Sequence, residues 1–125
     1  MKKLFTIIAM ASAIFTANTA FASTAETEAQ GSDNASTTER VSAHSTDEYE
    51  VYFKAGREVC VIVVGDTDTD LDLYVYDENG NLIDKDIDES DLCVCSWTPK
   101  WSGEFTIQVK NLGSVYNEYV ISVAQ

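Results

Sequence analysis

The chain has 125 residues, enough for one small domain, and carries 21 acidic against 8 basic side chains, a formal net charge of −13 at pH 7. A chain this acidic is repelled by nucleic acid phosphates and by anionic lipid surfaces, which argues against both as partners. The charge suits calcium, cationic partners or solubility in a salty medium.

The first 22 residues have the three parts of a secretory signal peptide. Lys2 and Lys3 form a positive start, residues 4–15 are mostly apolar and uncharged, and residues 20–22 read Ala-Phe-Ala, a small-x-small cleavage site. The apolar run is too short for a comfortable membrane span, which needs roughly 20 residues. We therefore expect a secreted or periplasmic protein whose mature chain starts at Ser23 and has no membrane span. Two lysines and no acid are removed, so its charge is about −15.

Residues 23–46 are predicted to form a disordered linker. Residues 23–38 contain no large apolar side chain, so this stretch cannot offset the entropy lost on ordering.

From residue 47 onward, short apolar or alternating runs predict strands. The runs are 49–53, 59–64, 71–76, 82–83, 92–97, 104–110 and 116–123. Residues 59–64 are apolar at every position, which favours a strand covered on both faces, whereas 71–76 and 104–110 alternate. Asn79-Gly80 indicates a hairpin turn. Strands at intervals of about 8–12 residues without a convincing helix predict an all-β fold, a small β-sandwich of about seven to eight antiparallel strands over 47–125.

Four aspartates at every second position are candidate metal ligands: Asp66, Asp68, Asp70 and Asp72. This spacing suits a loop around calcium, which prefers oxygen ligands. It is not an EF-hand, because Leu71 and Asp77 stand where that loop needs Gly and Glu. A second cluster, Asp84, Asp86, Asp88 and Asp91, could approach the first across the hairpin. The alternative is a solvated acidic edge whose carboxylates cap loop amides.

The three cysteines are Cys60, Cys93 and Cys95. An exported protein meets an oxidising compartment, so we expect a disulfide. A Cys93–Cys95 ring would be strained, which leaves Cys60–Cys93 or Cys60–Cys95, and we prefer Cys60–Cys93. The alternative is three buried reduced thiols that act as small apolar side chains. Zinc would need a fourth ligand, and the only histidine, His44, lies in the predicted linker.

Three aromatic residues, Tyr74, Tyr76 and Trp101, are candidate binding residues. Tyr74 and Tyr76 share the strand face opposite the core, where an aromatic strip could grip a peptide or a sugar. The alternative is a half-buried second sheet face. The sequence offers few candidate catalytic groups: it has one histidine and neither a Gly-x-Ser-x-Gly nor a His-Glu-x-x-His motif. We therefore predict that the chain is not an enzyme.

Four separated blocks carry a family resemblance. They are residues 65–77 (GDTDTDLDLYVYD), 97–99 (WTP), 101–105 (WSGEF), and 109–113 (VKNLG) followed by 117–119 (NEY). In this order they resemble the bacterial pre-peptidase C-terminal domain, and the resemblance covers roughly residues 47–125.

The resemblance implies a jelly-roll-like β-sandwich. Such domains usually accompany secreted proteases and other exported hydrolases; some are similar to collagen-binding modules of clostridial collagenases, and some of those bind calcium. No catalytic domain accompanies this one, so we expect a stand-alone, secreted, non-catalytic binding or accessory module that acts on an extracellular protein, peptide, polymer or glycan. The alternatives are a calcium-stabilised structural or surface protein and a secreted protease inhibitor or regulator.

Overall fold

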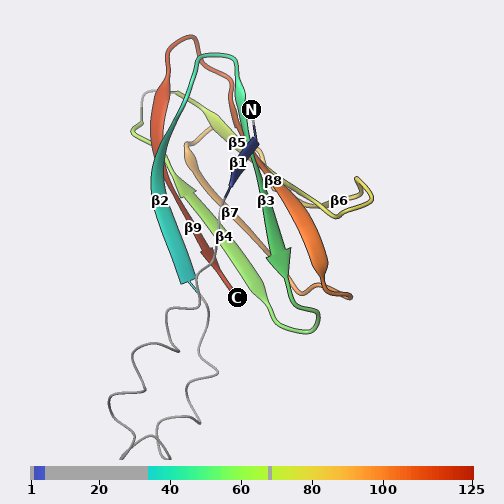
Figure 1. The fold of residues 1–125 in the computed structure, drawn as a ribbon. Helices are drawn as coiled ribbons and strands as arrows, with labels where there is room; N and C mark the ends of the chain where they lie inside the picture. Colours follow the sequence, from blue (N-terminus) through green and yellow to red (C-terminus); the bar gives the residue numbers. More distant parts are fainter. Residues whose placement is uncertain (1, 5–33, 68) are drawn as a thin grey trace, which may run out of the picture.

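The computed structural model describes residues 2–4, 34–67 and 69–125. The regular elements in this part of the chain are strands: β1 (Lys2–Leu4), β2 (Asn34–Val41), β3 (Thr46–Phe53), β4 (Val59–Val64), β5 (Leu71–Tyr76), β6 (Leu82–Asp86), β7 (Leu92–Trp97), β8 (Gly103–Asn111) and β9 (Asn117–Ala124). Strands β2 to β9 form two four-stranded antiparallel sheets that face each other (Figure 1). The predicted all-β sandwich is confirmed.

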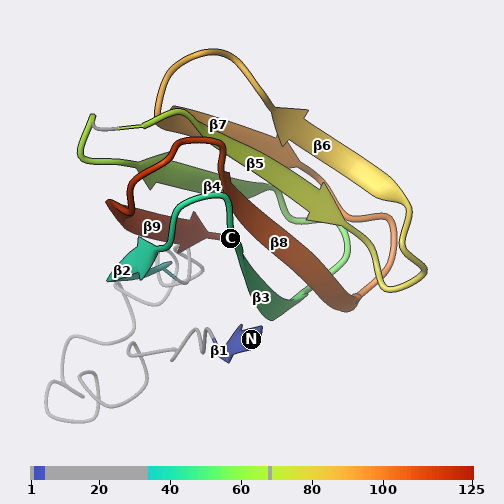
Figure 2. The same cartoon turned by 90° about the horizontal axis from the view of Figure 1, so that it is seen from above.

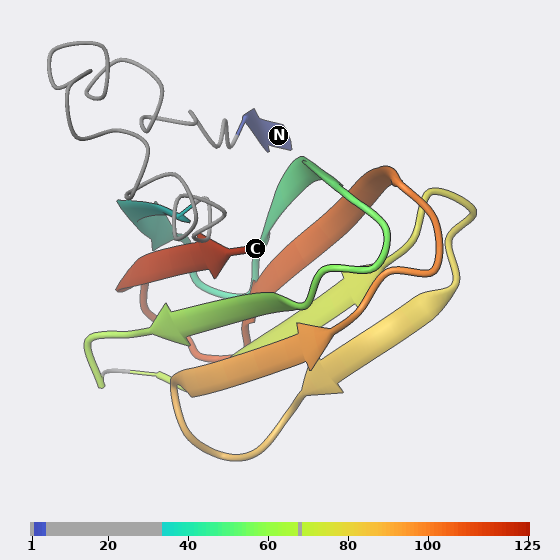
Figure 3. The same cartoon turned by 90° about the horizontal axis from the view of Figure 1, so that it is seen from below.

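The eight strands pair as one long hairpin rolled up on itself. β2 pairs with β9, β3 with β8, β4 with β7 and β5 with β6, all antiparallel. The pairs β4–β9 and β5–β8 then complete sheets of order β2-β9-β4-β7 and β3-β8-β5-β6. Nested pairing of this kind is the arrangement of an eight-stranded jelly roll. The two layers are visible from above and from below (Figures 2 and 3).

Alternation along the strands sends every second side chain between the two sheets. The predicted inward rows are all buried: Leu71, Leu73 and Val75; Phe105, Ile107 and Val109; and Tyr119, Ile121 and Val123. Phe53 lies at one end of this core, with its ring centroid 5.5 Å from Trp97 and 5.8 Å from Phe105. The alternating pattern alone therefore identified nine of the eighteen buried hydrophobic residues of this core.

The linker prediction is wrong for part of its range. Strand β2 lies inside residues 23–46 and pairs with β9 along its whole length. Its sequence is almost entirely polar, and only Val41 contributes a large, fully buried side chain. The strand is held chiefly by backbone hydrogen bonds to β9, a source of order that apolar content does not reveal. Among the described residues the sandwich thus begins at Asn34, not at Asp47.

Strand β1 lies within the predicted signal peptide. Lys2–Leu4 runs parallel to β3 and pairs with Glu48, Tyr49 and Glu50 at the edge of the sheet. The remainder of the predicted signal peptide and residues 23–33 lie outside the described residues. In the part of the chain that is described, no helix has the length and apolar character needed to cross a membrane.

A buried hydrogen bond between two tyrosine hydroxyls joins the two sheets. Tyr49 of β3 and Tyr119 of β9 point into the core, where their hydroxyl oxygens lie 2.6 Å apart. The Tyr119 hydroxyl donates a hydrogen bond of 2.6 Å to the Asp47 carboxylate. Burial, reinforced by the hydrogen bond to Asp47, raises the pKa of Tyr119, so its hydroxyl keeps its proton as a donor.

Candidate functional site

The outer face of sheet β3-β8-β5-β6 carries polar and aromatic side chains in cross-strand register. One row runs from Glu48 of β3 through Gln108 of β8 to Tyr74 of β5. The Gln108 side-chain amide donates a hydrogen bond of 2.9 Å to Glu48. We call this surface the acidic–aromatic face; it consists of Glu48, Glu50, Asp72, Tyr74, Tyr76, Thr106, Gln108 and Lys110.

Two predicted binding residues form the centre of this face. The rings of Tyr74 and Tyr76 are stacked, with centroids 6.3 Å apart and planes 12° from parallel. The Lys110 ammonium lies 5.3 Å from the Tyr74 ring centroid, within the range of a cation–π interaction. Partial burial and the nearby Asp72 charge raise the pKa of Tyr74. With their rings stacked, the two tyrosines present a preformed aromatic platform.

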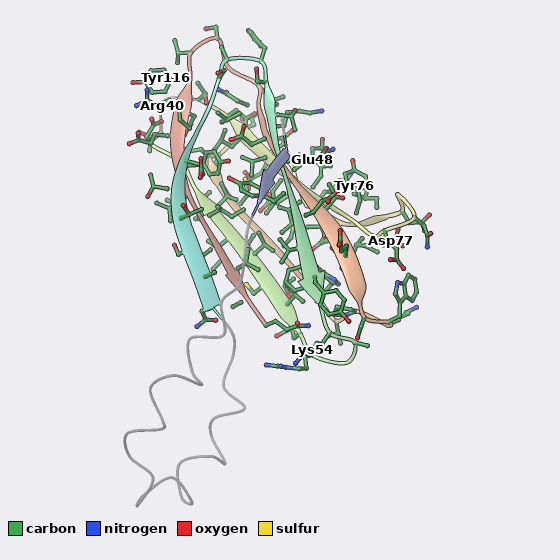
Figure 4. The ribbon with its side chains drawn as sticks, in the orientation of Figure 1. Arg40, Glu48, Lys54, Tyr76, Asp77 and Tyr116 are labelled. Carbon is green, nitrogen blue, oxygen red and sulfur yellow. The ribbon has the colours of Figure 1, made fainter. Side chains whose placement is uncertain are left out.

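A shallow acidic groove of about 390 Å³ adjoins the platform. Its lining residues are Glu48, Glu50, Tyr76, Asp77, Glu78, Gly80, Thr106 and Gln108. Figure 4 shows Glu48, Tyr76 and Asp77 on the same side of the sandwich. Four of the lining residues are carboxylic acids and none is basic, so the groove favours a positively charged group.

The turn between β5 and β6 forms one end of the groove. The Asp77 carboxylate accepts the backbone N–H groups of Asn79 and Asn81, both at 2.9 Å, and the Asn81 side-chain amide at 3.0 Å. These hydrogen bonds, the Asn81 side chain first, lower the pKa of Asp77. Gly80 has a φ of 82°, a left-handed conformation that glycine adopts without strain, which confirms the predicted Asn-Gly turn.

Trp101, the third predicted binding residue, is not part of the tyrosine stack. It lies in the connection from β7 to β8 with 43% of its surface exposed. That connection enters β8 at Gly103, where an added Cβ would lie 3.2 Å from the Glu78 carboxylate. Trp101 therefore belongs to the same end of the face as the turn, and in the described part of the chain no ring contact joins it to Tyr74 or Tyr76.

The predicted aspartate ladder is divided by the fold. The Asp66 carboxylate accepts the backbone N–H of Glu118 at 3.0 Å, at the start of β9, and Asp68 lies outside the described residues. Asp70 and Asp72 each keep one buried carboxylate oxygen without a hydrogen-bond partner. No group of three or more Asp, Glu, His or Cys side chains among the described residues is placed to hold a metal ion.

The environment of Asp70 and Asp72 disfavours their charged forms. Burial is the first cause for both, and it raises both pKa values. Asp88, Glu89 and Asp91 add repulsion at Asp70, and Asp70 adds repulsion at Asp72. Lys110, the cross-strand partner of Asp72, offsets only part of that effect.

The second aspartate cluster covers a sheet edge. Among the described strands, β7 is the last of its sheet, so its outer N–H groups have no partner in a described strand. Asp86 accepts the Val94 N–H at 2.9 Å, and Asp84 accepts the Ser96 N–H at 3.0 Å. Asp84 and Asp86 therefore match the alternative to a metal site, in which carboxylates cap backbone amides at an acidic edge.

Asp72→Asn is expected to raise the melting temperature in calcium-free buffer at pH 7. The folded-state pKa of Asp72 lies above the ordinary value of 3.8, so the carboxylate destabilises the fold once it is charged. The penalty falls as the pH drops through the folded pKa and is absent below the unfolded one, so at about pH 3 the variant should match the parent chain. Asp77→Asn is the control of opposite sign and should lower the melting temperature at pH 7. Thermal melts at both pH values check this, and equal melting temperatures at pH 7 would contradict it.

The preferred disulfide is wrong. Cys60 pairs in register with Ser96 and faces outward from β4, whereas Cys93 and Cys95 are buried on the core side of β7. Cys93 lies three residues along β7 from the Cys60 partner, about 10 Å at the rise of a strand, which exceeds the Cα separation a disulfide spans.

Cys93 and Cys95 behave as buried apolar residues. Burial raises the pKa of each thiol to about 12, and the Cys93 thiol donates to the Leu71 carbonyl at 3.1 Å. All three cysteines are free thiols in the structure. The alternative prediction, buried thiols that act as small apolar side chains, therefore describes Cys93 and Cys95, while Cys60 is only partly buried.

No known family is matched at the level of sequence. No protein-family model matches the chain, and no curated protein matches it. Solved structures do match. The pre-peptidase C-terminal domain of a collagenase from Bacillus anthracis has a TM-score of 0.63 at 14% identity, covering 72% of this chain and 88% of that one.

Two further solved structures share the fold. A periplasmic inhibitor of g-type lysozyme from Aeromonas hydrophila has a TM-score of 0.57 at 16% identity, covering 77% of this chain and 90% of that one. A mitogen from Yersinia pseudotuberculosis has a TM-score of 0.56 at 17% identity, covering 72% and 83%. At these identities the similarity shows the fold alone. The family that the four sequence blocks resemble is represented among these structures, and membership in it stays an interpretation.

Sequence reasoning missed the acids that line the groove. Glu48 and Glu50 alternate with the buried Tyr49 and Val51. Because successive side chains of a strand point to opposite faces, this alternation predicts that both glutamates point away from the core. No local sequence pattern predicts that Glu78 lines the groove, because only the tertiary structure brings the β5–β6 turn against β8.

Proposed function

We propose that the chain is an exported, non-catalytic binding module that recognises a basic protein through the acidic–aromatic face. The observation that carries this proposal is the groove with four acidic lining residues beside the stacked Tyr74 and Tyr76. Carboxylates would steer and orient a cationic partner, and the tyrosines would supply rigid contact area at low entropic cost.

Charge and fold both support this proposal. A net charge of −13 accelerates encounter with a cationic protein and repels an anionic one. Proteins of this fold include one described as a periplasmic inhibitor of g-type lysozyme, so the fold is compatible with binding an enzyme. A secreted inhibitor or regulator of an enzyme is the specific form of the proposal that we would test first, with a g-type lysozyme as the probe.

Replacing both stacked tyrosines is expected to weaken binding of the basic partner at least tenfold. Aromatic side chains at the centre of an interface often contribute more than 1 kcal/mol each, and about 1.4 kcal/mol is a factor of ten in Kd. Titration calorimetry of Tyr74→Ala/Tyr76→Ala against the g-type lysozyme, and then against basic exported proteins, measures this. Added salt should weaken binding by the parent chain because the attraction is electrostatic.

Tyr116→Ala is the matched control. Its ring is exposed and lies against Arg40, with the ring centroid 4.3 Å from the guanidinium carbon, away from the acidic–aromatic face (Figure 4). Tyr116→Ala should therefore bind like the parent chain. An equal loss in both variants, or no binding to any basic protein in the series, would overturn the proposal.

Calcium stabilisation is our second proposal, and it is supported by Asp70 and Asp72. Both carry a buried oxygen without a partner and a raised pKa, an arrangement that a bound cation would relieve. Asp66 fits the ion less well, since its carboxylate already accepts the Glu118 N–H. Of the predicted ligands, the proposal therefore rests on Asp70 and Asp72, and calcium would supply the positive charge that these two carboxylates lack.

Calcium is expected to raise the melting temperature of the chelator-treated chain, because a ligand that binds only the folded state stabilises it by mass action. Asp70→Asn/Asp72→Asn should abolish the shift, and Asp66→Asn should keep it. Differential scanning calorimetry with calcium and with magnesium measures each shift. Identical melting curves of the parent chain with and without calcium would rule this second proposal out.

A further inference from the structure

The outer face of sheet β2-β9-β4-β7 is apolar, and no element of the described residues covers it. Five aliphatic side chains, between 36% and 51% exposed, lie next to one another on it: Ile62, Val64, Leu92, Val94 and Val120. The strand register sets them side by side, since Ile62 faces Val94, and Val64 lies between Leu92 and Val120. We call these five residues the neutral face.

This side of the sandwich is almost free of charge. Among the outward residues of its four described strands, the charged ones are Arg40 and Glu118, and these neutralise each other in an ion pair of 3.2 Å. The chain as a whole carries −13. The surplus of acidic groups is therefore concentrated away from this face.

The sequence of β4 adds an independent argument. Residues 59–64 are apolar at every position, a pattern typical of strands covered on both faces. The described part of the chain covers only one face: Val59, Val61 and Val63 are fully buried, whereas Ile62 and Val64 remain exposed. The described residues do not supply the second cover that this pattern predicts.

We infer that a second copy of this chain covers the neutral face, with the two sheets packed face to face. A copy with a charge of −13 is repelled by the acidic surfaces of its partner, and the neutral face is where two copies approach without that repulsion. Flat faces of Val, Ile and Leu on adjacent strands pack on one another in the same way as the two sheets inside a β-sandwich. The inference does not depend on the proposed function, which uses the opposite face.

The size of the face sets the strength of the dimer. Four strands about 4.8 Å apart and about six residues long cover roughly 20 Å by 20 Å. That footprint is below the roughly 800 Å² per partner of a stable complex. We therefore expect a reversible, concentration-dependent dimer. Added salt should strengthen it by screening the repulsion between the copies, the reverse of its effect on the binding of a basic protein.

Cys60 provides a reporter that needs no substitution. It faces outward from β4 in register between Ser96 and Ala124, next to Ile62, and it lines a shallow groove of about 400 Å³ on this side of the sheet. Cys93 and Cys95 are fully buried in the core, so a thiol reagent reacts with Cys60 first. Dimerisation should slow the alkylation of Cys60.

Sedimentation equilibrium of the purified chain over a wide concentration range tests the inference. A monomer–dimer equilibrium is expected, with slower Cys60 alkylation at the concentrations that favour the dimer. Val64→Lys, at an exposed position that leaves the core intact, should weaken association at least tenfold. Val115→Lys makes the same chemical change at an exposed position in the β8–β9 connection and should associate like the parent chain.

Three outcomes would overturn the inference. One is a monomer at every concentration with a constant rate of Cys60 alkylation. Another is a dimer that Val64→Lys and Val115→Lys weaken equally, which would place the interface elsewhere. The third is a monomer that binds zwitterionic lipid vesicles and loses that binding in Val64→Lys, which would assign the face to a membrane surface.

Discussion

Phe53→Ala is expected to lower the free energy of unfolding by about 3–5 kcal/mol, the range for a large aromatic side chain removed from a packed core. Phe53 is fully buried at the end of β3. Its ring contacts Trp97 edge-on, with planes at 86°, and also packs against Phe105. The substitution would therefore leave a cavity between the two sheets and also remove two favourable ring contacts.

Chemical denaturation of Phe53→Ala beside Tyr52→Ala measures this effect. Tyr52 is the preceding residue on the same strand, but it points outward with 59% of its surface exposed. Its replacement should change the stability by no more than about 0.5 kcal/mol. A loss of less than about 2 kcal/mol for Phe53→Ala would mean that the end of the sandwich collapses around the cavity.

Asn117→Ala is expected to cost about 3 kcal/mol, because one fully buried amide ties two segments together. Its oxygen accepts the Asp66 N–H at 3.1 Å, and its nitrogen donates to the Thr69 hydroxyl at 3.0 Å. The connection between β4 and β5 is thereby anchored to the start of β9. Without the amide, the part-buried Asp66 N–H and Thr69 hydroxyl lose their partners.

Asn79→Ala is the control for this substitution. Asn79 lies exposed in the β5–β6 turn, where its backbone N–H rather than its side chain makes the hydrogen bond to Asp77. Equilibrium unfolding should show a near-parental free energy for Asn79→Ala. Hydrogen exchange should show faster exchange in residues 65–70 only for Asn117→Ala. Equal stabilities of the two variants would contradict the anchoring role.

Local patterns in the sequence were sufficient for the fold class. Residues 71–76 and 104–110 alternate, and the side chains assigned to the core from that alternation are buried. The Asn79-Gly80 step marked the hairpin turn because glycine adopts a positive φ without strain. Strand geometry and turn geometry depend on neighbouring residues, so a single sequence carries this information.

Two predictions, the linker over residues 23–46 and the Cys60–Cys93 disulfide, were wrong because a local sequence pattern does not show which strand pairs with which. Strand β2 is polar and was assigned to a linker, but it is held by eight residues in register with β9, which lies at the other end of the chain. In the uniformly apolar run 59–64, the pattern does not distinguish the inner from the outer face, so the outward orientation of Cys60 was hidden.

The sequence by itself determined that this is an acidic all-β sandwich, which strand positions face its core, and that Tyr74 and Tyr76 lie together on the opposite face. The tertiary structure alone decided how the carboxylates divide, with Asp84 and Asp86 on the edge of β7 and Glu78 beside the groove. It also decided which face of β4 the described residues leave exposed. The physical reason is that side-chain alternation is a local property of a strand, whereas pairing across the jelly roll joins residues far apart in the chain.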